Sequence, residues 1–225
     1  MIFHPKQGRS VTLQPTIVIA TLNEGKCAEI AQLLKGFSVS IKSLGDVGPV
    51  PSVEEDGDTF EENAYKKASF TARVLGMPAL ADDSGLKVAA LDGRPGVHSA
   101  RYAGRHASDM DRCRKLLAEM AGVRNRRAVF ACVISIAVPS GLALTYEAVC
   151  KGCIAETAAG TNGFGYDPVF YYPPFDKTFA QMTPEEKNRI SHRGRALREV
   201  AGEFDRILKW IELKMPADRA AFGYK

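Results

Sequence analysis

Two adjacent carboxylates, Asp82 and Asp83, directly follow the apolar run Ala79–Ala81. We expect that run to be a short strand ending at the pair, which puts the carboxylates where α/β proteins build their sites. One carboxylate at such a place can bind Mg²⁺ and help to orient or deprotonate a water molecule. The alternative is that Asp82 caps a turn or a helix and that Asp83 is solvated.

A strand-to-helix junction lies near the start of the chain. The β-branched run Thr16–Thr21 predicts a buried strand, and Asn23-Glu24-Gly25-Lys26 follows it, before apolar residues at helical spacing. Backbone N–H groups at a helix N-terminus bind anions, and Lys26 adds a positive charge one turn in. The Walker pattern is absent, because there is no glycine-rich lead and no Lys-Ser/Thr pair. A phosphate loop and an ordinary strand–helix turn both fit this stretch.

An acidic run, Glu54-Glu55-Asp56, lies in a Pro- and Gly-rich stretch, residues 45–57, that we expect to be a loop. Such runs are usually solvated, but beside a phosphate loop this one could supply a second metal ligand. Thr59-Phe-Glu-Glu62 is a capping box and predicts a helix reaching about Leu75. Asn63 and Lys67 lie one turn apart on that helix, so they share a face and could reach the same phosphates.

Two stretches in the C-terminal half combine aromatic residues with hydrogen-bond donors: Gly163-Phe164-Gly165-Tyr166-Asp167-Pro168 and Lys187 to Gly194, which includes His192 and Arg193. Glycines beside an aromatic ring allow the ring to approach a flat ligand, and lysine, histidine and arginine offer donors. Donors beside an aromatic face suit a purine with a 6-oxo group, because that oxygen accepts where the amino group of adenine donates. The alternative is that Phe164 and Tyr166 are core residues and His192 is a helix cap.

The remaining pattern alternates strands with helices, which predicts an α/β fold with a mixed sheet. A second strand is expected at Val39–Ile41, and Leu86–Leu91 is expected to pair with the Ala79–Ala81 strand as a hairpin. Further expected elements are a helix from Ser108 to Ala121, an antiparallel pair Ala128–Val138 and Leu142–Ile154, and a helix whose apolar stripe runs from Leu197 to Ile211. No internal repeat and no domain boundary is visible.

Composition excludes several classes of protein. With 45% hydrophobic and 25% charged residues, the chain is an ordinary globular protein, and we expect it to be soluble and cytoplasmic, without a membrane partner. The net charge of +4 resides in the terminal stretches 1–15 and 214–225, so it gives no reason to expect nucleic-acid binding. The cluster Arg124/Arg126/Arg127 is interpreted as a solvated turn. Five cysteines imply no disulfide framework, and we expect Cys150 and Cys153 to be reduced thiols.

Taken together, six motifs resemble the inosine/xanthosine triphosphate pyrophosphatase family and occur in that family's order between residues 16 and 213. They are Thr21-x-Asn-x-x-Lys26, Thr59-Phe-x-Glu-Asn63-Ala, Ala81-Asp-Asp-Ser-Gly-Leu86, Ser99-Ala-Arg-Tyr102, Gly163-Phe-Gly-Tyr-Asp-Pro168 and Glu186-Lys-x-x-x-Ser-His-Arg193. The resemblance therefore predicts one pyrophosphatase domain over residues 16–213, with terminal tails at 1–15 and 214–225.

The resemblance implies a two-lobed α/β fold around a long, twisted mixed sheet, with the active site in the central cleft, and a homodimer. It also implies Mg²⁺-dependent hydrolysis of dITP, ITP and XTP to the monophosphate and pyrophosphate. Asp83 would be the proton acceptor and a metal ligand, and Glu54 the other ligand, although one sequence does not decide between Glu54 and Glu55. The substrate contacts implied, including the neighbours of matched motif positions, are Thr21, Asn23, Glu24, Gly25, Lys26, Asn63, Lys67, Ser84, Phe164, Gly165, Tyr166, Asp167, Lys187, His192 and Arg193.

Two other functions remain open at this point: a pyrophosphatase for modified pyrimidine nucleotides, and a nucleotide-binding sensor without turnover. An adjacent carboxylate pair favours an enzyme over a sensor. One position departs from the family pattern, because Leu22 stands where many relatives have glycine. If that position requires a positive φ, leucine would be strained there, and otherwise its side chain would pack.

Overall fold

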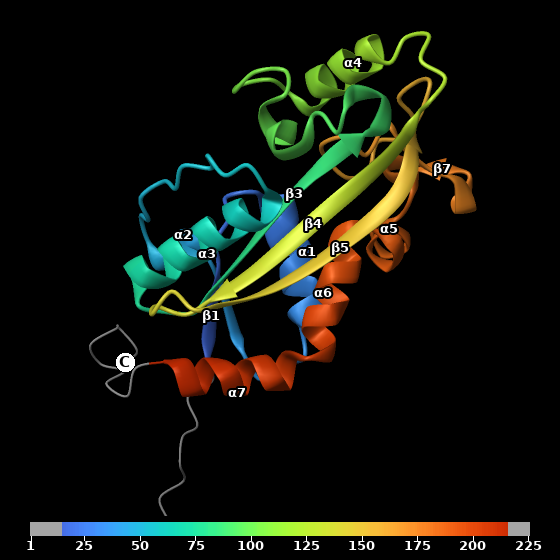
Figure 1. Ribbon diagram of the computed structural model, residues 1–225. Helices are drawn as coiled ribbons and strands as arrows, with labels where there is room; N and C mark the ends of the chain where they lie inside the picture. The colour runs from blue at the N-terminus through green and yellow to red at the C-terminus, as the bar shows by residue number, and fades with distance from the viewer. Residues whose placement is uncertain (1–14, 216–225) are drawn as a thin grey trace, which may run out of the picture.

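The computed structural model describes residues 15–215 (Figure 1). Its strands are β1 (Thr16–Ile19), β2 (Ser40–Ser43), β3 (Ala79–Val88), β4 (Arg127–Ala137), β5 (Ala143–Ile154), β6 (Phe170–Tyr172) and β7 (Lys177–Thr178). Its α-helices are α1 (Glu24–Leu34), α2 (Leu44–Val47), α3 (Phe60–Leu75), α4 (Asp109–Glu119), α5 (Pro184–Ile190), α6 (His192–Gly202) and α7 (Phe204–Lys214). Short 3₁₀ helices are η1 (Ala89–Leu91), η2 (Gly96–Arg101), η3 (Pro173–Phe175) and η4 (Phe179–Gln181). The described elements thus run from Thr16 to Lys214, and most of both expected tails lies outside the described residues.

One mixed sheet organises the molecule, in the strand order β2-β1-β3-β4-β5-β6-β7. The pairs β2–β1 and β1–β3 are parallel, and the remaining pairs are antiparallel. This confirms the α/β class and the antiparallel pair β4–β5. The long strands β3, β4 and β5 run from a lower lobe with α1, α3, α6 and α7 into an upper lobe with α4 (Figure 1). The two lobes of the expected fold are therefore joined by these three strands.

Helices cover both faces of the sheet in the lower lobe. On one face, α3 buries its apolar stripe of Phe60, Ala64, Ala68 and Ala72. That stripe, the capping box at Thr59 and the end at Leu75 were all predicted, because each depends on local sequence. On the other face, α1, α6 and α7 form the main core with β1, β3 and β4. No helix among residues 15–215 is long and apolar enough to cross a membrane.

The expected hairpin at Leu86 is wrong. Residues 79–88 form one ten-residue strand, β3, which pairs with β4 along its whole length. Beyond Leu80 its other edge leaves β1, and the Leu86 N–H donates to the Ser99 hydroxyl at 2.9 Å. Asp82 and Asp83 consequently lie in mid-strand, and successive side chains of a strand point to opposite faces of the sheet.

Three smaller interpretations are also corrected. The expected C-terminal helix is two helices, α6 and α7, separated at Glu203. Residues 45–47 of the expected loop belong to the short helix α2. Arg126 is not a solvated turn residue, because its guanidinium donates to the carbonyls of Met120, Ile154 and Ala155 at 2.6–3.0 Å. The five cysteines are all free, as expected.

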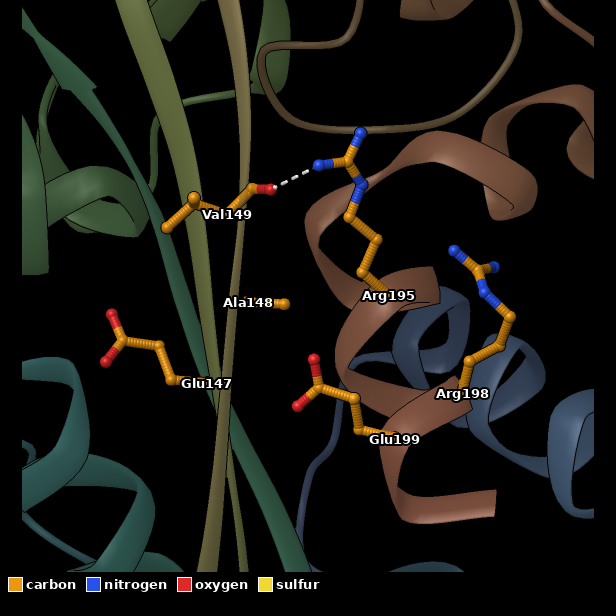
Figure 2. A pocket seen from close by; sticks show the side chains of 6 residues that line it. All are labelled: Glu147, Ala148, Val149, Arg195, Arg198 and Glu199. Carbon is orange, nitrogen blue, oxygen red and sulfur yellow. Dashed lines mark hydrogen bonds between the residues drawn. The ribbon is translucent and has the colours of Figure 1, made fainter. Parts of the chain in front are cut away.

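Strand β5 has an open edge. It pairs with β6 only at Cys153 and Ile154, so residues 143–152 have no strand partner on that side among the described residues. Figure 2 shows the groove of about 670 Å³ between this edge and α6, where Arg195 Nη1 donates to the Val149 carbonyl at 3.1 Å. A long side chain that occupies an edge carbonyl makes strand addition harder. Among the residues that the structure describes, the groove lining contains Glu147 and Glu199 but no serine, threonine or cysteine nucleophile.

Candidate active site

The cleft opens where β1 ends. β1 pairs with β3 only as far as Ile19 and Leu80, so the loop at residues 20–23 and the N-terminus of α1 lie beside the continuing edge of β3. Asn23 caps α1, with its Oδ1 accepting from the Lys26 N–H at 3.0 Å, and the Thr21 hydroxyl accepts from the Asn23 N–H. The Lys26 side chain, at the end of the expected phosphate loop, lies 3.1 Å from Asp82 Oδ2 of β3.

The Asp82 carboxylate is surrounded by cationic side chains on one face of β3. Its Oδ2 lies 3.1 Å from Lys26 Nζ and accepts from Arg193 Nε and Nη2 at 3.2 and 3.1 Å and from the Ser84 hydroxyl at 2.7 Å. Burial by itself would raise the pKa of this carboxyl, but Lys26, Arg193 and Lys67 hold the pKa well below its usual range. Asp82 therefore stays ionised, and it is not the turn or helix cap of the alternative interpretation.

Asp83 occupies the opposite face, against α3. Its Oδ1 accepts from Lys67 Nζ at 2.7 Å, and the same ammonium group lies 3.4 Å from Glu55 Oε2. Burial raises the pKa of Asp83 above its ordinary value, although Lys67 opposes that shift. A carboxylate whose pKa is moved toward neutrality is better suited to accept a proton than an ordinary aspartate.

The acidic loop runs beside α3, and successive residues of the loop contact side chains of the helix. Asn63 Oδ1 accepts from the Gly57 N–H at 2.9 Å and its Nδ2 donates to the Gly57 carbonyl, while Lys66 pairs with Asp56 and Lys67 with Glu55. Asn63 is buried and both ends of its amide are engaged by Gly57, so the structure does not bring it to the phosphate loop. Its observed partner is the acidic loop, which its helical spacing from Lys67 could not reveal.

The contacts of this loop distinguish the two candidate metal ligands, Glu54 and Glu55. Glu55 approaches Asp83 through Lys67, and its backbone carbonyl accepts from Arg101 Nη2 at 3.2 Å. Glu54 is exposed. The geometry thus favours Glu55 over the expected Glu54 as the partner of Asp83.

Two carboxylates sharing one cation form a plausible site for a divalent ion. The described residues contain no group of three or more His, Cys, Asp or Glu side chains placed to hold a metal. Mg²⁺ is commonly held by one or two carboxylates together with substrate phosphates and water, so Asp83 and Glu55 fit that ion. They would not suit an ion that needs a full set of protein ligands.

A cavity of about 160 Å³ lies on the other side of the phosphate loop, between the lobes. Asn23, which borders it, also borders a groove of about 690 Å³ lined by Thr21, Glu55 and Lys67. The cavity lining comes from both lobes: Asn23, Lys26, Ser84, Gly85, Ser99, Ala100, Asp109, Arg112, Phe130, Phe164, Gly165, Tyr166, Asp167, Lys187, His192 and Arg193. Asn23 therefore borders both the cavity and the groove, and the groove contains Lys67, the partner of Asp83.

Phe164 forms an aromatic wall of the cavity. Its ring lies below Lys187 Nζ, 4.7 Å from the ring centre, and a Cβ atom on Gly25 would come within 3.0 Å of the ring. Asp167 accepts from Lys187 Nζ at 2.7 Å and from the Phe164 N–H at 2.9 Å. Tyr166 is buried, with its hydroxyl donating to the Ser99 carbonyl at 2.9 Å, so it matches the alternative interpretation of a core residue.

His192 lies deep in the cavity wall. It is buried, and its ring stacks on Phe130 with the ring centres 4.5 Å apart. Its Nδ1 has no hydrogen-bond partner among the described residues. Burial, with Arg193 and Lys187 nearby, lowers the pKa of His192 well below its ordinary value, so the ring is neutral. A neutral imidazole whose ring nitrogen has no partner can form a hydrogen bond with a ligand in the cavity.

Arg193 is less free than expected, and the reason is a residue that sequence reasoning missed. Besides its bonds to Asp82, its Nη1 donates to Glu29 Oε2 at 2.5 Å, and Glu29 also lies 3.3 Å from Lys187 Nζ. Lys26, Asp82, Arg193, Glu29, Lys187 and Asp167 form one chain of alternating charges from the phosphate loop to the Phe164 wall. Glu29 could have been suspected, because it lies one helical turn after Lys26 on α1.

At two remaining positions of the expected phosphate loop, Glu24 and Leu22, the side chain makes no hydrogen bond or ion pair among the described residues. Glu24 is exposed in the first turn of α1. Leu22 is 86% exposed and is not among the described non-glycine residues with positive φ, Asp92 and Asp176. Leu22 is therefore neither strained nor packed, and it borders the groove beside the carboxylates.

Comparison with known proteins shows which family the whole chain resembles. The model of the Ham1 family matches residues 17–203. The chain is 61% identical over 198 residues to a dITP/XTP pyrophosphatase of Syntrophobacter fumaroxidans (88% of this chain, 85% of the relative) and 54% identical over 207 residues to one of Desulfotalea psychrophila (92% and 93%). A solved HAM1 protein from Coxiella burnetii has a TM-score of 0.80 at 43% identity, covering 85% of this chain and 99% of that one. The Staphylococcus aureus Ham1 protein has a TM-score of 0.78 at 42% identity (84% and 98%).

Proposed function

This chain belongs to the Ham1 family, and from that membership and its cleft we propose that it hydrolyses non-standard purine nucleoside triphosphates, dITP, ITP, XTP and dXTP, to the monophosphate and pyrophosphate. Such a reaction removes deaminated purines from the nucleotide pool. The observation that carries the proposal is the buried Asp83 carboxylate, which pairs with Lys67. Lys67 also lies 3.4 Å from Glu55, and Lys67 and Glu55 both line a groove shared with the Thr21–Asn23 loop. A nucleotide-binding sensor would not need this arrangement.

The triphosphate extends along the groove from the N-terminus of α1. Backbone N–H groups of the first turn and the Thr21 and Asn23 side chains bind its oxygens. Lys26 and Lys67 offset the charge that develops on the leaving pyrophosphate. Both ammonium groups pair with the aspartates of β3, so the phosphates compete with these carboxylates for the lysines.

Asp83 accepts the proton of the water that attacks the α-phosphorus. Its buried position makes the charged carboxylate less stable than in water, which favours proton uptake. Asp83 and Glu55 would hold Mg²⁺, which supplies charge stabilisation on the phosphate oxygens. Ser84 contributes indirectly in this geometry, since its hydroxyl donates to Asp82.

The base enters the cavity between the lobes and lies against Phe164. His192 and Lys187 offer polar groups to the 6-oxo edge, and Arg193 reaches the same cavity while bound to Asp82 and Glu29. A site built from donors disfavours the 6-amino group of adenine, because a donor would face a donor. Membership of the family further leads us to propose a homodimer located in the cytoplasm.

A product assay across a nucleotide panel tests the proposed function. With Mg²⁺ present, dITP, ITP and XTP should release pyrophosphate and the monophosphate, with kcat/KM well above the values for ATP, GTP and dTTP. Release of orthophosphate would exclude a pyrophosphatase. Preference for dTTP or another pyrimidine nucleotide would replace purine clearance with a pyrimidine substrate, and binding of all these nucleotides without turnover would identify a sensor.

A further inference from the structure

The loop that carries Phe164 is held in place from the upper lobe. Gly163 and Gly165 have φ values of +76° and +64°, so the backbone turns sharply on both sides of Phe164. A Cβ atom at Gly163 would lie 2.0 Å from Asp167 Oδ2, which leaves no room for a side chain. These turns determine where the Phe164 side chain leaves the backbone, so groups that bind the neighbouring peptides help to position the ring.

Helix α4 contacts both backbone polar groups of Gly165, its N–H and its carbonyl oxygen. Asp109 Oδ2 accepts from the Gly165 N–H at 2.6 Å, and Cys113 Sγ lies 3.4 Å from the Gly165 carbonyl oxygen. Asp109 and Cys113 are four residues apart on α4, so they lie on the same face of the helix. The bond from Asp109 is charge-assisted, and such bonds are roughly twice as strong as those between neutral groups.

Asp109 is itself held in position. The Arg112 guanidinium donates to its carboxylate and also to the carbonyls of Ala100 and Ala107, at 2.9 and 2.8 Å. Ala100 belongs to η2, and the neighbouring Ser99 carbonyl accepts from the Tyr166 hydroxyl at 2.9 Å. Helix α4, η2 and the Phe164 loop thus form a closed circuit of hydrogen bonds around the cavity, in which Asp109 makes the contact to the peptide that follows Phe164.

We propose that Asp109 is a positioning residue for purine recognition: by holding the Gly165 N–H it keeps the Phe164 ring in place as the wall against which the base lies. This inference rests on the proposed function, because it assumes a purine nucleotide in the cavity. It also predicts a division of labour, since Asp109 is connected to the base side of the cleft and makes no contact with Lys67 or Asp83. Removing its carboxylate should weaken binding of the base and leave binding of the phosphates unchanged.

Calorimetric titration with the two products separates these contributions. For Asp109→Ala, we expect the Kd of inosine monophosphate to rise about 5- to 50-fold, because the Gly165 N–H loses its partner. The Kd of pyrophosphate should stay within twofold, and KM for ITP should rise more than kcat falls. Asp109→Asn keeps a carbonyl acceptor and should restore most of the affinity for the monophosphate.

Asp111→Ala is the matched control. Asp111 is another acidic residue in the first turn of α4, but its carboxylate accepts from Ser108 within its own helix cap. This variant should bind both products like the parent protein. If Asp109→Ala fails to fold, as judged by circular dichroism, Asp109→Glu keeps the charge at the helix terminus, displaces the carboxylate from Gly165, and should show the same selective loss.

Three results would overturn the inference: an unchanged Kd for inosine monophosphate, equal weakening of both products, or an Asp111→Ala variant as impaired as Asp109→Ala. Failure of the proposed function is recognised separately. A parent protein that binds inosine monophosphate but does not hydrolyse ITP rules out the reaction, and the binding comparison still decides the role of Asp109.

Discussion

At the scale of single residues, two Lys–Asp pairs lie on opposite faces of β3. Lys26 pairs with Asp82 on the face of α1 and α6, and Lys67 pairs with Asp83 on the face of α3. Their surroundings shift the pKa values of the two aspartates in opposite directions. Asp82 is surrounded by cations that keep it ionised, which suits an anchor, whereas burial makes Asp83 readier to take up a proton.

Asp83→Asn tests that assignment. The amide keeps the shape of the side chain but neither accepts the proton nor contributes charge to a metal site, so kcat should fall by roughly 10²–10⁴-fold. Nucleotide binding without Mg²⁺ should survive, as measured by calorimetry. Activity within a few-fold of the parent would make Asp83 a structural residue and move the search for the base to other groups.

The two glutamates of the acidic loop form a natural pair of variants. Glu55→Gln removes the carboxylate that faces Asp83 through Lys67, so the Mg²⁺ concentration for half-maximal activity should rise by about tenfold or more. Glu54→Gln alters an exposed side chain and should leave the Mg²⁺ dependence within twofold. The reverse ranking would show that the loop rearranges when the metal binds.

His192 gives the fold a pH dependence of known sign. Its folded-state pKa is lowered by burial, whereas in the unfolded chain it is about 6.5, so below that pH only the unfolded state takes up the proton. The free energy of unfolding should therefore fall by up to about 1.4 kcal/mol per pH unit between pH 6 and the folded-state pKa. Urea denaturation of the parent and His192→Gln at pH 8 and pH 5.5 checks this, because the variant should lose less stability. Equal losses would show that His192 is protonated in the folded state.

At the scale of elements, the continuity of β3 determines what the site looks like. The strand carries Asp82 and Asp83 past the end of β1 and then passes Gly85, where a Cβ atom would lie 2.5 Å from the Gly96 carbonyl oxygen and 2.6 Å from Ser99 Oγ. This close approach joins the strand to η2. The acidic loop is built in a comparable way, through the contact of Asn63 with Gly57.

Gly85→Ala should therefore destabilise the protein by about 1–3 kcal/mol, because the added methyl group overpacks against backbone as well as side chain. Gly202→Ala is the control, since a Cβ atom there meets nothing within 4 Å and the residue ends α6. Removing a helical glycine should stabilise by about 0.5–1 kcal/mol. Chemical denaturation measures both, and an unaffected Gly85→Ala would mean that η2 can move away from β3.

The predictability of these elements from sequence depends on whether their determinants are local. The capping box and apolar stripe of α3 were predicted because they lie within the helix itself. The continuation of β3 was missed because Asp-Asp-Ser-Gly has the composition of a turn, and it is pairing with β4 that keeps it extended. The division between α6 and α7 was missed because Val200, Phe204 and Ile211 keep a helical spacing across it.

At the scale of the whole molecule, two lobes are joined by β3, β4 and β5 (Figure 1). The cavity and the groove, in which we propose that the base and the phosphates bind, both border Asn23. Motifs far apart in the sequence converge there, so the resemblance predicted most of the lining. It did not predict Glu29 or Asp109, because their roles arise from packing of α1 against α6 and of α4 against the Phe164 loop. It also did not reveal that Asn63 binds Gly57.

We propose that this cleft directs water to the α-phosphorus of a deaminated purine nucleotide. Hydrolysis of dITP in H₂¹⁸O, followed by mass spectrometry of the products, shows which phosphorus atom the water attacks. We expect dIMP carrying one ¹⁸O atom and unlabelled pyrophosphate, with both products greatly reduced in Asp83→Asn. Label in the pyrophosphate, or formation of dIDP and orthophosphate, would contradict it.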